Sequence, residues 1–415
     1  MSKTIPAHNF CNSVFDGTHD TPKPCENGHP LILSKNIQRN SINLQDTYNI
    51  SEEDYNAINA RSKVSQWDIL FSMIGTVGSV YLEKSKDIPY AIKNMGVFST
   101  KDELKAKWLY YYLQTNEAKS IISNYLNGAV QKFLPLGFLR EFPVREMPRN
   151  AKEIISVLEN IDSKIDNNNA IAAELEGMAK DLYDYWFVQF DFPDENGKPY
   201  KSSGGKMVWN EELKREIPEG WEVSQLKDIC FLRNGINYDK NEVGDADFKI
   251  ANVRNITAST FLMDVNDFDV IHLKKEKAKQ YSLKPEDIVI ARSGTPGAIR
   301  LVQNPKNDTI FCGFIICCTP KVAKYRNYMA YTLKLFEGTS ATKTGGSILQ
   351  NVSQDTLNSL ILCIPPDELI EKFNIMITSI LEEIQNTINE SRELTSLRDF
   401  LLPMLMNGQV KVKGA

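Results

Sequence analysis

A heptad seam is the feature of this sequence that most limits how the chain can fold. Ten residues follow one another at alternating steps of four and three: Ile154, Leu158, Ile161, Ile165, Asn168, Ala172, Leu175, Ala179, Leu182 and Trp186. This spacing puts them on one face of an α-helix of roughly 36 residues, about 54 Å long at ~1.5 Å per residue. A helix of that length with one mainly apolar stripe needs a partner to cover the stripe.

The seam recurs later in the chain at a constant numbering offset of 219. Its second copy is Phe373, Ile377, Ile380, Ile384, Thr387, Ser391, Leu394, Arg398, Leu401 and Leu405. The polar middle also recurs, with Asn168 matched by Thr387 and Ala172 by Ser391. We therefore expect two long helices that pack antiparallel within the chain. Two separate core helices are the alternative.

The same offset of 219 extends beyond the helices. The matched pairs are Asn36-Ile37 with Asn255-Ile256, Asp68-Ile69 with Asp287-Ile288, Gly75-Thr76-Val77-Gly78 with Gly294-Thr295-Pro296-Gly297, and Gln131 with Gln350. Similarity over a whole domain indicates a tandem duplication of a unit made of a globular part followed by a long helix. The duplication implies pseudo-twofold symmetry in the folded chain.

The predicted fold class is mixed α/β (α+β), with many short strands. The expected boundaries are a first domain over 1–148, a helix over 149–192, a linker over 193–209, a second domain over 210–366 and a helix over 367–415. Within the first domain we expect strands at Leu31–Leu33 and Trp67–Met73 and a helix over 102–125. The first copy should begin abruptly, without a counterpart to the lead-in at 217–223. Pro403 should interrupt the last helix, and Gly408 should end it.

Composition is that of an ordinary globular protein, with 42% hydrophobic and 24% charged residues. No apolar run reaches the ~18 residues of a membrane span, and the N-terminus lacks the apolar core of a signal peptide. Cys312, Cys317 and Cys318 lie in an apolar run and are predicted to be buried thiols, which indicates a reducing cytoplasm.

The net charge of −5 argues against a simple basic nucleic-acid-binding protein. The acidity lies on the helices, because residues 149–192 carry −5 and residues 367–415 carry −3. The globular segments are close to neutral, at +1 for 1–148 and +2 for 193–366. A local basic face on each globular part is compatible with these values.

Catalytic and cofactor motifs are absent or incomplete in the sequence. It has no phosphate-binding Gly-x-x-x-x-Gly-Lys-Ser/Thr, and its four histidines have no metal-ligand spacing. Pro193-Asp194 followed by Glu212-Leu213-Lys214 fits a loose pattern of metal-dependent nucleases. That pattern requires carboxylates on paired strands, whereas Asp194 opens a linker and the first copy has no equivalent.

Polar side chains at corresponding places in the two copies are the candidates for binding. In the first copy they are Thr18, His19, Lys23, Lys35, Asn36, Arg39, Ser72, Thr76, Gln131 and Lys132. In the second they are Asn237, Tyr238, Arg254, Asn255, Arg292, Ser293, Thr295, Lys343, Thr344, Gln350 and Asn351. Arg, Lys, Asn and Gln read base edges, and Ser or Thr can bind phosphates. The alternative for each residue is ordinary turn chemistry, above all for the glycines beside them.

The whole chain resembles the specificity subunit of type I restriction–modification systems. The resemblance rests on the order of four segments within the duplicated unit: Asp16 to Pro22, Trp67 to Gly78, Pro285 to Gly294, and Leu397 to Gln409. It implies two target-recognition domains held apart by antiparallel helices, with no catalytic role for the chain. Each domain would read one half of a split, asymmetric double-stranded DNA sequence.

The resemblance also implies the partners. Two modification subunits would dock on the helices, bind S-adenosylmethionine and methylate adenine, while restriction subunits would use ATP and magnesium. No cofactor would belong to this chain. We expect Trp186, Phe187, Met404 and Met406 to be exposed apolar groups for this docking.

Two other functions remain open from the residues alone. One is the divalent-metal nuclease, which cleavage by the isolated chain with magnesium would reveal. The other is a coiled-coil scaffold whose globular ends bind proteins. Salt-dependent DNA affinity separates the scaffold from a DNA-binding protein, because phosphate contacts make affinity fall steeply with salt.

Overall fold

The computed structural model describes residues 3–38, 40–44, 47–127, 133–239, 243–258, 260–337 and 352–412. The chain divides into two compact units. Unit 1 is Met1–Asp166 with Ser391–Ala415, and unit 2 is Asn167–Glu390. Each unit holds a globular part and one half of each long helix. Among the described residues, no helix is long and apolar enough to cross a membrane.

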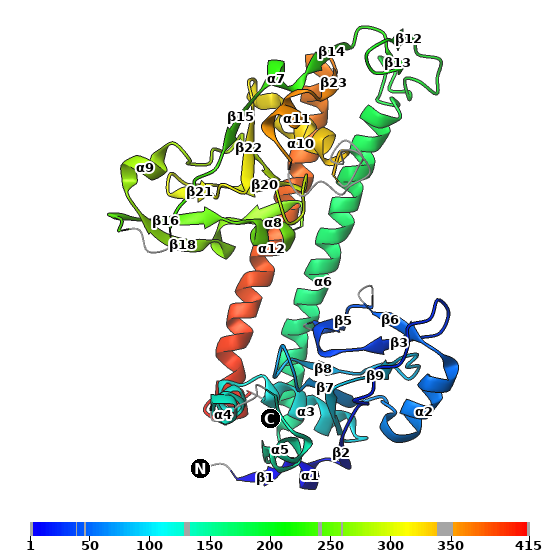
Figure 1. Cartoon of the computed structure of the whole chain (residues 1–415), viewed down its shortest axis with the longest axis vertical. Helices are drawn as coiled ribbons and strands as arrows, with labels where there is room; N and C mark the ends of the chain where they lie inside the picture. The colour runs from blue at the N-terminus through cyan, green and yellow to red at the C-terminus, as the bar shows by residue number, and fades with distance from the viewer. Residues whose placement is uncertain are drawn as a thin grey trace. The chain divides into compact units, whose positions relative to one another are not determined.

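The two long helices are α6 (Ala151–Tyr183), extended by a π-helical turn over Asp184–Val188, and α12 (Asp367–Met406). They lie side by side (Figure 1). Within unit 2, Asn168 donates to Glu390 at 2.7 Å, and the ring of Tyr183 lies 6.3 Å from that of Phe373. As the residue number rises along α6, the number of the contacting residue on α12 falls. The predicted antiparallel pair is confirmed.

The predicted seam positions are buried or half-buried on both helices. Pro403 does not interrupt α12, which continues to Met406, so that prediction is wrong. A proline near a helix end removes only one backbone bond of the last turns, and the carbonyl of Pro403 still accepts from the amide of Asn407 at 2.9 Å. Gly408, at φ 69°, follows the helix end as predicted.

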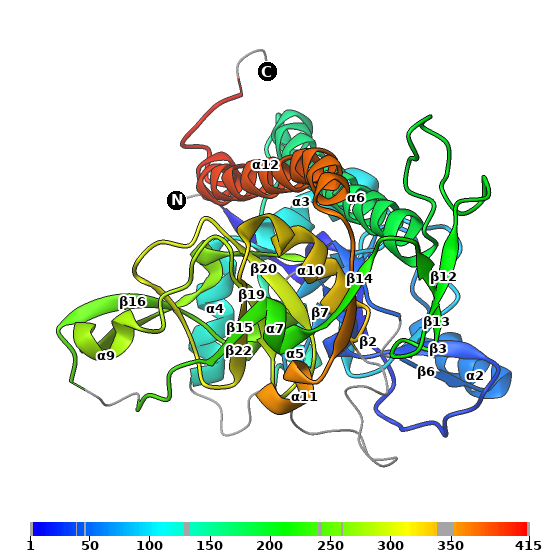
Figure 2. The ribbon, with the colours of Figure 1, turned by 90° about the horizontal axis from the view of Figure 1, so that it is seen from above.

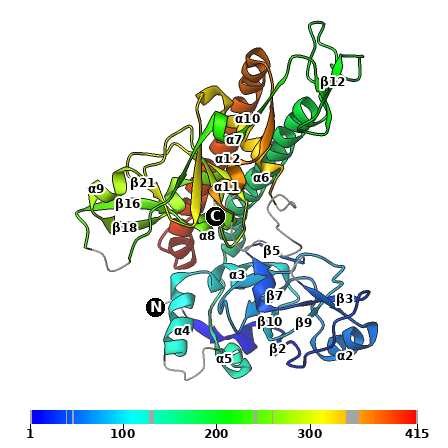
Figure 3. The same cartoon turned by 45° about the horizontal axis from the view of Figure 1, so that its top comes forward.

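The described residues of unit 1 form two main sheets. The larger has the order β2 (Ser13–Asp16), β10 (Met95–Ser99), β7 (Asp68–Ser72), β8 (Val80–Leu82), and the smaller has β6 (Tyr48–Ile50), β3 (His29–Ile32), β9 (Ala91–Ile92). Two further pairs are β1 (Thr4–Pro6) with β11 (Pro143–Arg145) and β4 (Ile37–Gln38) with β5 (Ser41–Ile42). β7, β10 and β2 lie side by side in Figure 3. The strands expected near residues 31 and 67 are therefore present.

The helices of unit 1 are α1 (Ala7–Phe10), the 3-10 turn η1 (Ser34–Asn36), α2 (Glu52–Ser62), α3 (Glu103–Leu113), α4 (Asn116–Asn127) and α5 (Leu136–Glu141). The single helix expected over 102–125 is wrong, because it is split into α3 and α4. Thr115 causes the break, since its hydroxyl accepts from the amide of Ala118 at 3.2 Å and starts a new helix.

The described residues of unit 2 form four sheets. The largest sheet has the strand order β15 (Cys230–Asn234), β22 (Ile315–Pro320), β19 (Ile288–Ala291), β20 (Ile299–Gln303), β17 (Leu262–Asp264), and a three-stranded sheet has the order β18 (Asp269–Leu273), β16 (Ala246–Ala251), β21 (Thr309–Phe311). Two further sheets are strand pairs: β12 (Met207–Asn210) with β13 (Arg215–Pro218), and β14 (Glu222–Gln225) with β23 (Ile361–Ile364). The helices are α7 (Leu226–Ile229), α8 (Val253–Ala258), η3 (Val265–Asp267), α9 (Lys275–Lys279), η4 (Ala323–Tyr325), α10 (Arg326–Lys334) and α11 (Gln354–Asn358). In Figure 2, α10 lies against β20.

The two units repeat one topology. The order β2-β10-β7-β8 in unit 1 corresponds to β15-β22-β19-β20 in unit 2, and β6-β3-β9 corresponds to β18-β16-β21. The two three-stranded sheets each contain one parallel pair, β3 with β9 and β16 with β21. β1 with β11 corresponds to β14 with β23. The internal duplication is confirmed. The first copy nevertheless has an opening strand, β1, which corrects the expectation of an abrupt start.

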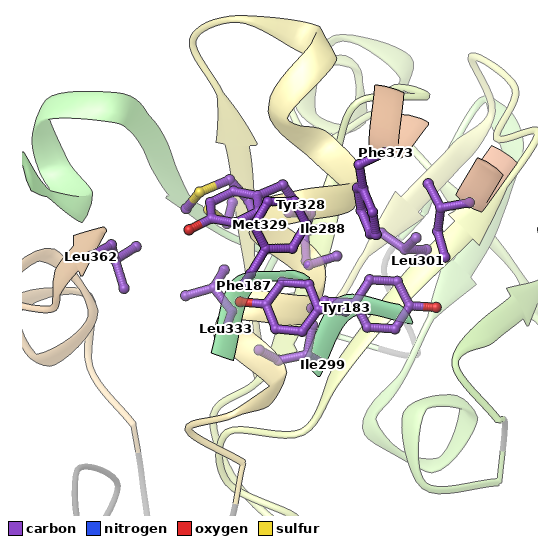
Figure 4. Packing of buried hydrophobic residues seen from close by; sticks show 14 of the residues in the cluster. Tyr183, Phe187, Ile288, Ile299, Leu301, Tyr328, Met329, Leu333, Leu362 and Phe373 are labelled. Atoms are coloured by element: carbon purple, nitrogen blue, oxygen red, sulfur yellow. The ribbon is translucent and has the colours of Figure 1, made fainter. Parts of the chain in front are cut away.

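Aromatic side chains anchor the long helices in the core of unit 2. Phe187 lies 4.9 Å from Phe373 and 4.8 Å from Tyr328, measured between ring centroids (Figure 4). Trp186, Phe187 and Met406 are buried, and Met404 is half-buried, so the exposure expected for these four residues is wrong. The three cysteines at 312, 317 and 318 are buried as predicted. Burial raises the pKa of the Cys317 thiol.

Candidate DNA interface

A hairpin turn of the same geometry occupies corresponding places in both units. Gly75 and Gly294 have φ values of 76° and 77°, a region that glycine adopts without strain. The amide of Gly78 donates to the carbonyl of Ser72 at 3.0 Å, and that of Gly297 donates to the carbonyl of Ala291 at 2.8 Å. The turns join β7 to β8 and β19 to β20. These glycines therefore form the turns, as the sequence indicated.

A short helical segment lies beside each turn and carries an exposed basic residue. In unit 1 the hydroxyl of Thr76 donates to the carbonyl of Ser34 at 3.3 Å, which places η1 and Lys35 next to the turn. In unit 2 the hydroxyls of Thr295 and Thr257 are 3.4 Å apart, which places α8 next to the β19–β20 turn. Lys35 of η1 and Arg254 of α8 are related by the offset of 219. The duplication thus repeats a cation beside a hairpin.

A third segment joins this face in each unit. In unit 1, His19 Nδ1 is 2.8 Å from Asn94 Oδ1, and the hydroxyl of Ser34 donates to the Asn94 carbonyl at 3.5 Å. In unit 2, Asn237 packs so closely on Gly313 that a Cβ there would lie 2.0 Å from Asn237 Oδ1. The two contacts correspond, because Asn94 and Gly313 are also related by the offset of 219.

Arg292 extends the cationic character of the unit 2 face. Its Nη1 donates to the Gly313 carbonyl at 3.4 Å, and its Nε has no hydrogen-bond partner among the described residues. Ser293 and Thr295 follow it in the turn and are half-buried. Because Nε is buried, the two Nη groups are the donors that Arg292 could offer to a ligand.

Two candidates, Arg254 and His19, bind nearby carboxylates. The side chain of Arg254, 63% exposed, binds Asp269 through both Nε and Nη2, with the Nε bond at 3.2 Å. Hydrogen bonds to Asn94 and Asp16 raise the pKa of His19 above its ordinary value. His19 therefore carries a positive charge over a wider pH range than a free histidine.

Several candidates support the fold instead of pointing outward. Asn36 and Ser72 are fully buried, and Thr18 and Asn255 nearly so. The Ser72 hydroxyl donates to the Ile74 carbonyl at 3.0 Å inside the turn. Thr18 forms an isolated parallel β-bridge with Lys93, and the side-chain amine of Lys93 donates to the hydroxyl of Thr21. These four residues shape the face, and their exposed neighbours are the side chains that a ligand can reach.

Among the remaining candidates that the structure describes, Tyr238 forms a hydrogen bond with Asn252, whose Nδ2 donates to Asp269 at 3.0 Å. Lys23 is exposed, and Tyr238 is half-buried against the core of unit 2. Seven candidates lie outside the described residues: Arg39, Gln131, Lys132, Lys343, Thr344, Gln350 and Asn351. Asn94, at φ 54°, is one residue of this face that is not among the sequence candidates, although an asparagine before a strand is a common turn signal.

The nuclease pattern does not form a site in the described part of the chain. Asp194 accepts the amides of Asn196 and Lys198, both at 2.8 Å, and so closes a turn. Glu212 lies in the separate turn between β12 and β13. The described residues contain no group of three His, Cys, Asp or Glu side chains that could hold a metal.

Comparison with known proteins gives a family for both halves of the chain. The model of the type I restriction modification DNA specificity domain matches residues 20–177 and 218–397. The type I restriction enzyme MjaIX specificity subunit of Methanocaldococcus jannaschii is 25% identical over an alignment of 319 residues, covering 75% of this chain and 71% of that protein. The HindI specificity subunit of Haemophilus influenzae is 22% identical over 414 residues, covering 85% and 88%.

A solved structure has a similar fold. The crystal structure of a type I restriction–modification system S subunit from M. genitalium aligns with a TM-score of 0.53 and 15% identity, covering 98% of this chain and 96% of that one.

Proposed function

Because this chain belongs to the family of type I restriction modification DNA specificity domains, we propose that it is the DNA-recognition subunit of such a system and not an enzyme. Each unit reads one half of a split double-stranded target through the face built on its hairpin turn. The long helices connect the two readers and fix the length of DNA between the half-sites.

The repeated placement of a cation beside a hairpin carries this proposal. Lys35 beside Thr76 and Arg254 beside Thr295 are the same construction in two units that share one topology. Basic side chains bind phosphates and base edges, and hydroxyl groups bind phosphates. One such face suits any anion, whereas two equivalent faces in one chain suit a target that has two parts.

Differences between the two faces make the target asymmetric. Where unit 1 has Met73, unit 2 has Arg292 at the same offset. Arginine presents a planar fork that pairs with the two acceptors of guanine, whereas methionine has no strong donor. The two half-sites therefore differ in sequence.

The partners are two methyltransferase subunits, which bind S-adenosylmethionine and methylate adenine, and restriction subunits that use ATP and magnesium, all in a prokaryotic cytoplasm. Exposed apolar side chains on α12 support the docking. Ile375 and Phe400 are 73% and 62% exposed, and Met376 and Leu397 are 46% exposed each. Large apolar groups exposed on a long helix favour a protein partner.

The experiment is to map methylated adenines in a host that expresses the chain with its methyltransferase subunit. A motif with two different half-sites at a fixed spacing supports the proposal. A continuous motif, or methylation without sequence preference, contradicts it.

The helices are tested as the ruler by inserting seven residues near Asn168 and seven near Thr387, which keeps the heptad register. The insertion adds about 10 Å, or about three base pairs, and turns one half-site by roughly 100° about the DNA axis. The preferred spacer should lengthen with both half-site sequences unchanged, or binding should be lost because the rotation is not absorbed. Full activity restricted to the original spacer would exclude the helices as the ruler.

A further inference from the structure

Phe314 is an exposed aromatic residue on the candidate interface of unit 2. Its side chain is 62% exposed, although its chain neighbour Ile315 is fully buried. A single exposed phenylalanine is common on protein surfaces. Its position in the duplicated fold makes this residue informative.

Phe314 belongs to a turn that is one residue longer in unit 2 than in unit 1. Ile92 and Phe311 correspond, because each accepts a backbone hydrogen bond from the segment that follows the first strand of the larger sheet. The Ile92 carbonyl accepts from the amide of Thr18 in unit 1, and the Phe311 carbonyl accepts from the amide of Ile236 in unit 2. Met95 pairs with Ser72, and Ile315 pairs with Ala291, so Met95 and Ile315 also correspond. Between these landmarks, unit 1 has Lys93-Asn94 and unit 2 has Cys312-Gly313-Phe314. The extra residue in unit 2 is accommodated by placing a large apolar side chain on the surface.

The backbone places Phe314 opposite Arg292. The amide of Arg292 donates to the carbonyl of Phe314 at 2.9 Å, which continues the β19–β22 pairing one step past Ala291 and Ile315. Directly opposite residues in an antiparallel pair have Cβ atoms about 4.5–5.5 Å apart on the same face. Asn237 packs on Gly313 and Arg292 binds its carbonyl, so the turn that carries Phe314 is held on both sides.

The chemistry of the two side chains matches two features of the major groove. Arginine pairs with the O6 and N7 acceptors of guanine, and phenylalanine contacts the methyl group of thymine. Adjacent base pairs are about 3.4 Å apart, so neighbouring side chains on one face can reach neighbouring base pairs. Building on the function proposed above, we propose that Phe314 reads the methyl group of a thymine in the base pair next to the guanine read by Arg292. Unit 1, which lacks the inserted residue, has no such contact at the corresponding place.

A cycle of substitutions in protein and DNA tests this contact. The full chain, assembled with its methyltransferase subunits, is bound to a duplex that carries its mapped target, and each thymine of the unit 2 half-site is replaced by uracil, which lacks only the methyl group. At one thymine the replacement should weaken wild-type binding about fourfold, the factor supplied by one buried methyl group. The same replacement should not weaken binding by the Phe314→Ala variant further. An equal loss in wild type and variant, or a half-site without thymine beside guanine, overturns the proposal.

Phe231→Ala is the matched control, because Phe231 is also 62% exposed in unit 2 but lies opposite Thr319, toward the other end of β22. This variant should respond to uracil as the wild type does. If it instead loses the uracil effect, the contact is not specific to Phe314. Wild-type methylation at a bipartite motif, combined with no uracil effect at any thymine, would overturn the Phe314 contact while leaving the DNA-recognition function intact.

Discussion

Asn36 and Asn255, which the duplication places at equivalent positions, make the same hydrogen bond in the two units. Each side-chain Oδ1 accepts from the backbone amide three residues earlier, Leu33 in unit 1 and Asn252 in unit 2, at 2.9 Å in both cases. Each Nδ2 donates to a backbone carbonyl, of Asn43 at 3.1 Å and of Asp267 at 2.8 Å. The two residues hold the segments that present Lys35 and Arg254.

We expect Asn36→Ala to destabilise unit 1 by about 1–3 kcal/mol, because it leaves buried backbone groups without partners. The half-site sequence read by unit 1 should stay the same. Urea unfolding and methylation mapping measure the two effects. Asn27→Ala, at an exposed asparagine, is the control and should change stability by less than about 0.5 kcal/mol. A stable Asn36→Ala variant with altered specificity would make Asn36 a base-reading residue.

A buried ion pair joins the long helices inside unit 1. Arg398 Nη1 lies 3.1 Å from Asp162 Oδ1, and both side chains are about nine-tenths buried. The hydroxyl of Tyr111 donates to the other oxygen of Asp162 at 2.8 Å. Asp162→Ala should be destabilising, but by less than the ~3–5 kcal/mol of a wholly unpaired buried charge, because Arg398 keeps its bonds to Asp399.

The double variant Asp162→Leu/Arg398→Met separates the charge from the packing. It should be less destabilised than the sum of its two single variants, because no unpaired charge remains. Urea unfolding of all three variants measures the coupling. Strict additivity would mean that the pair contributes no interaction of its own.

Arg254 should contact phosphate, because Asp269 holds its guanidinium as an exposed, fixed cation. Arg254→Gln should weaken binding equally on all sequences and lower the slope of log K against log salt concentration by about 1. Fluorescence anisotropy across a salt series measures this slope. Lys227→Gln, at an exposed lysine on α7, should leave the slope unchanged. A sequence-dependent loss for Arg254→Gln would instead indicate base reading.

DNA affinity should fall as pH rises through the pKa of His19. Hydrogen bonds to Asn94 and Asp16 raise this pKa, so the imidazolium persists above the ordinary value near 6.5. The positive charge favours DNA below the raised pKa and is lost above it. Binding measured from about pH 6 to about pH 8.5 at constant ionic strength should show this decline in the wild type and lack it in His19→Gln. An identical pH profile in both proteins would rule out His19 as the titrating group.

The long-range features of the fold were predictable, because heptad spacing and a constant offset are visible without any contact information. Asn36 and Asn255 are candidates for binding on sequence grounds, since a polar residue after a strand does not reveal whether it points inward. The break at Thr115 was missed because the apolar pattern continues across it. Phe314 was missed because the inserted residue appears only when strand pairing identifies Met95 with Ile315.

The central claim is that each unit reads its own half of a split target. The most direct measurement is the set of methylated sites produced by complexes that contain wild-type chain, Lys35→Ala or Arg292→Ala. Lys35→Ala should weaken or relax only the half-site of unit 1, and Arg292→Ala only that of unit 2, at a cost of about 1–3 kcal/mol for a base-reading arginine. If either variant changes both half-sites equally, or if the wild-type motif is not split, the account is contradicted.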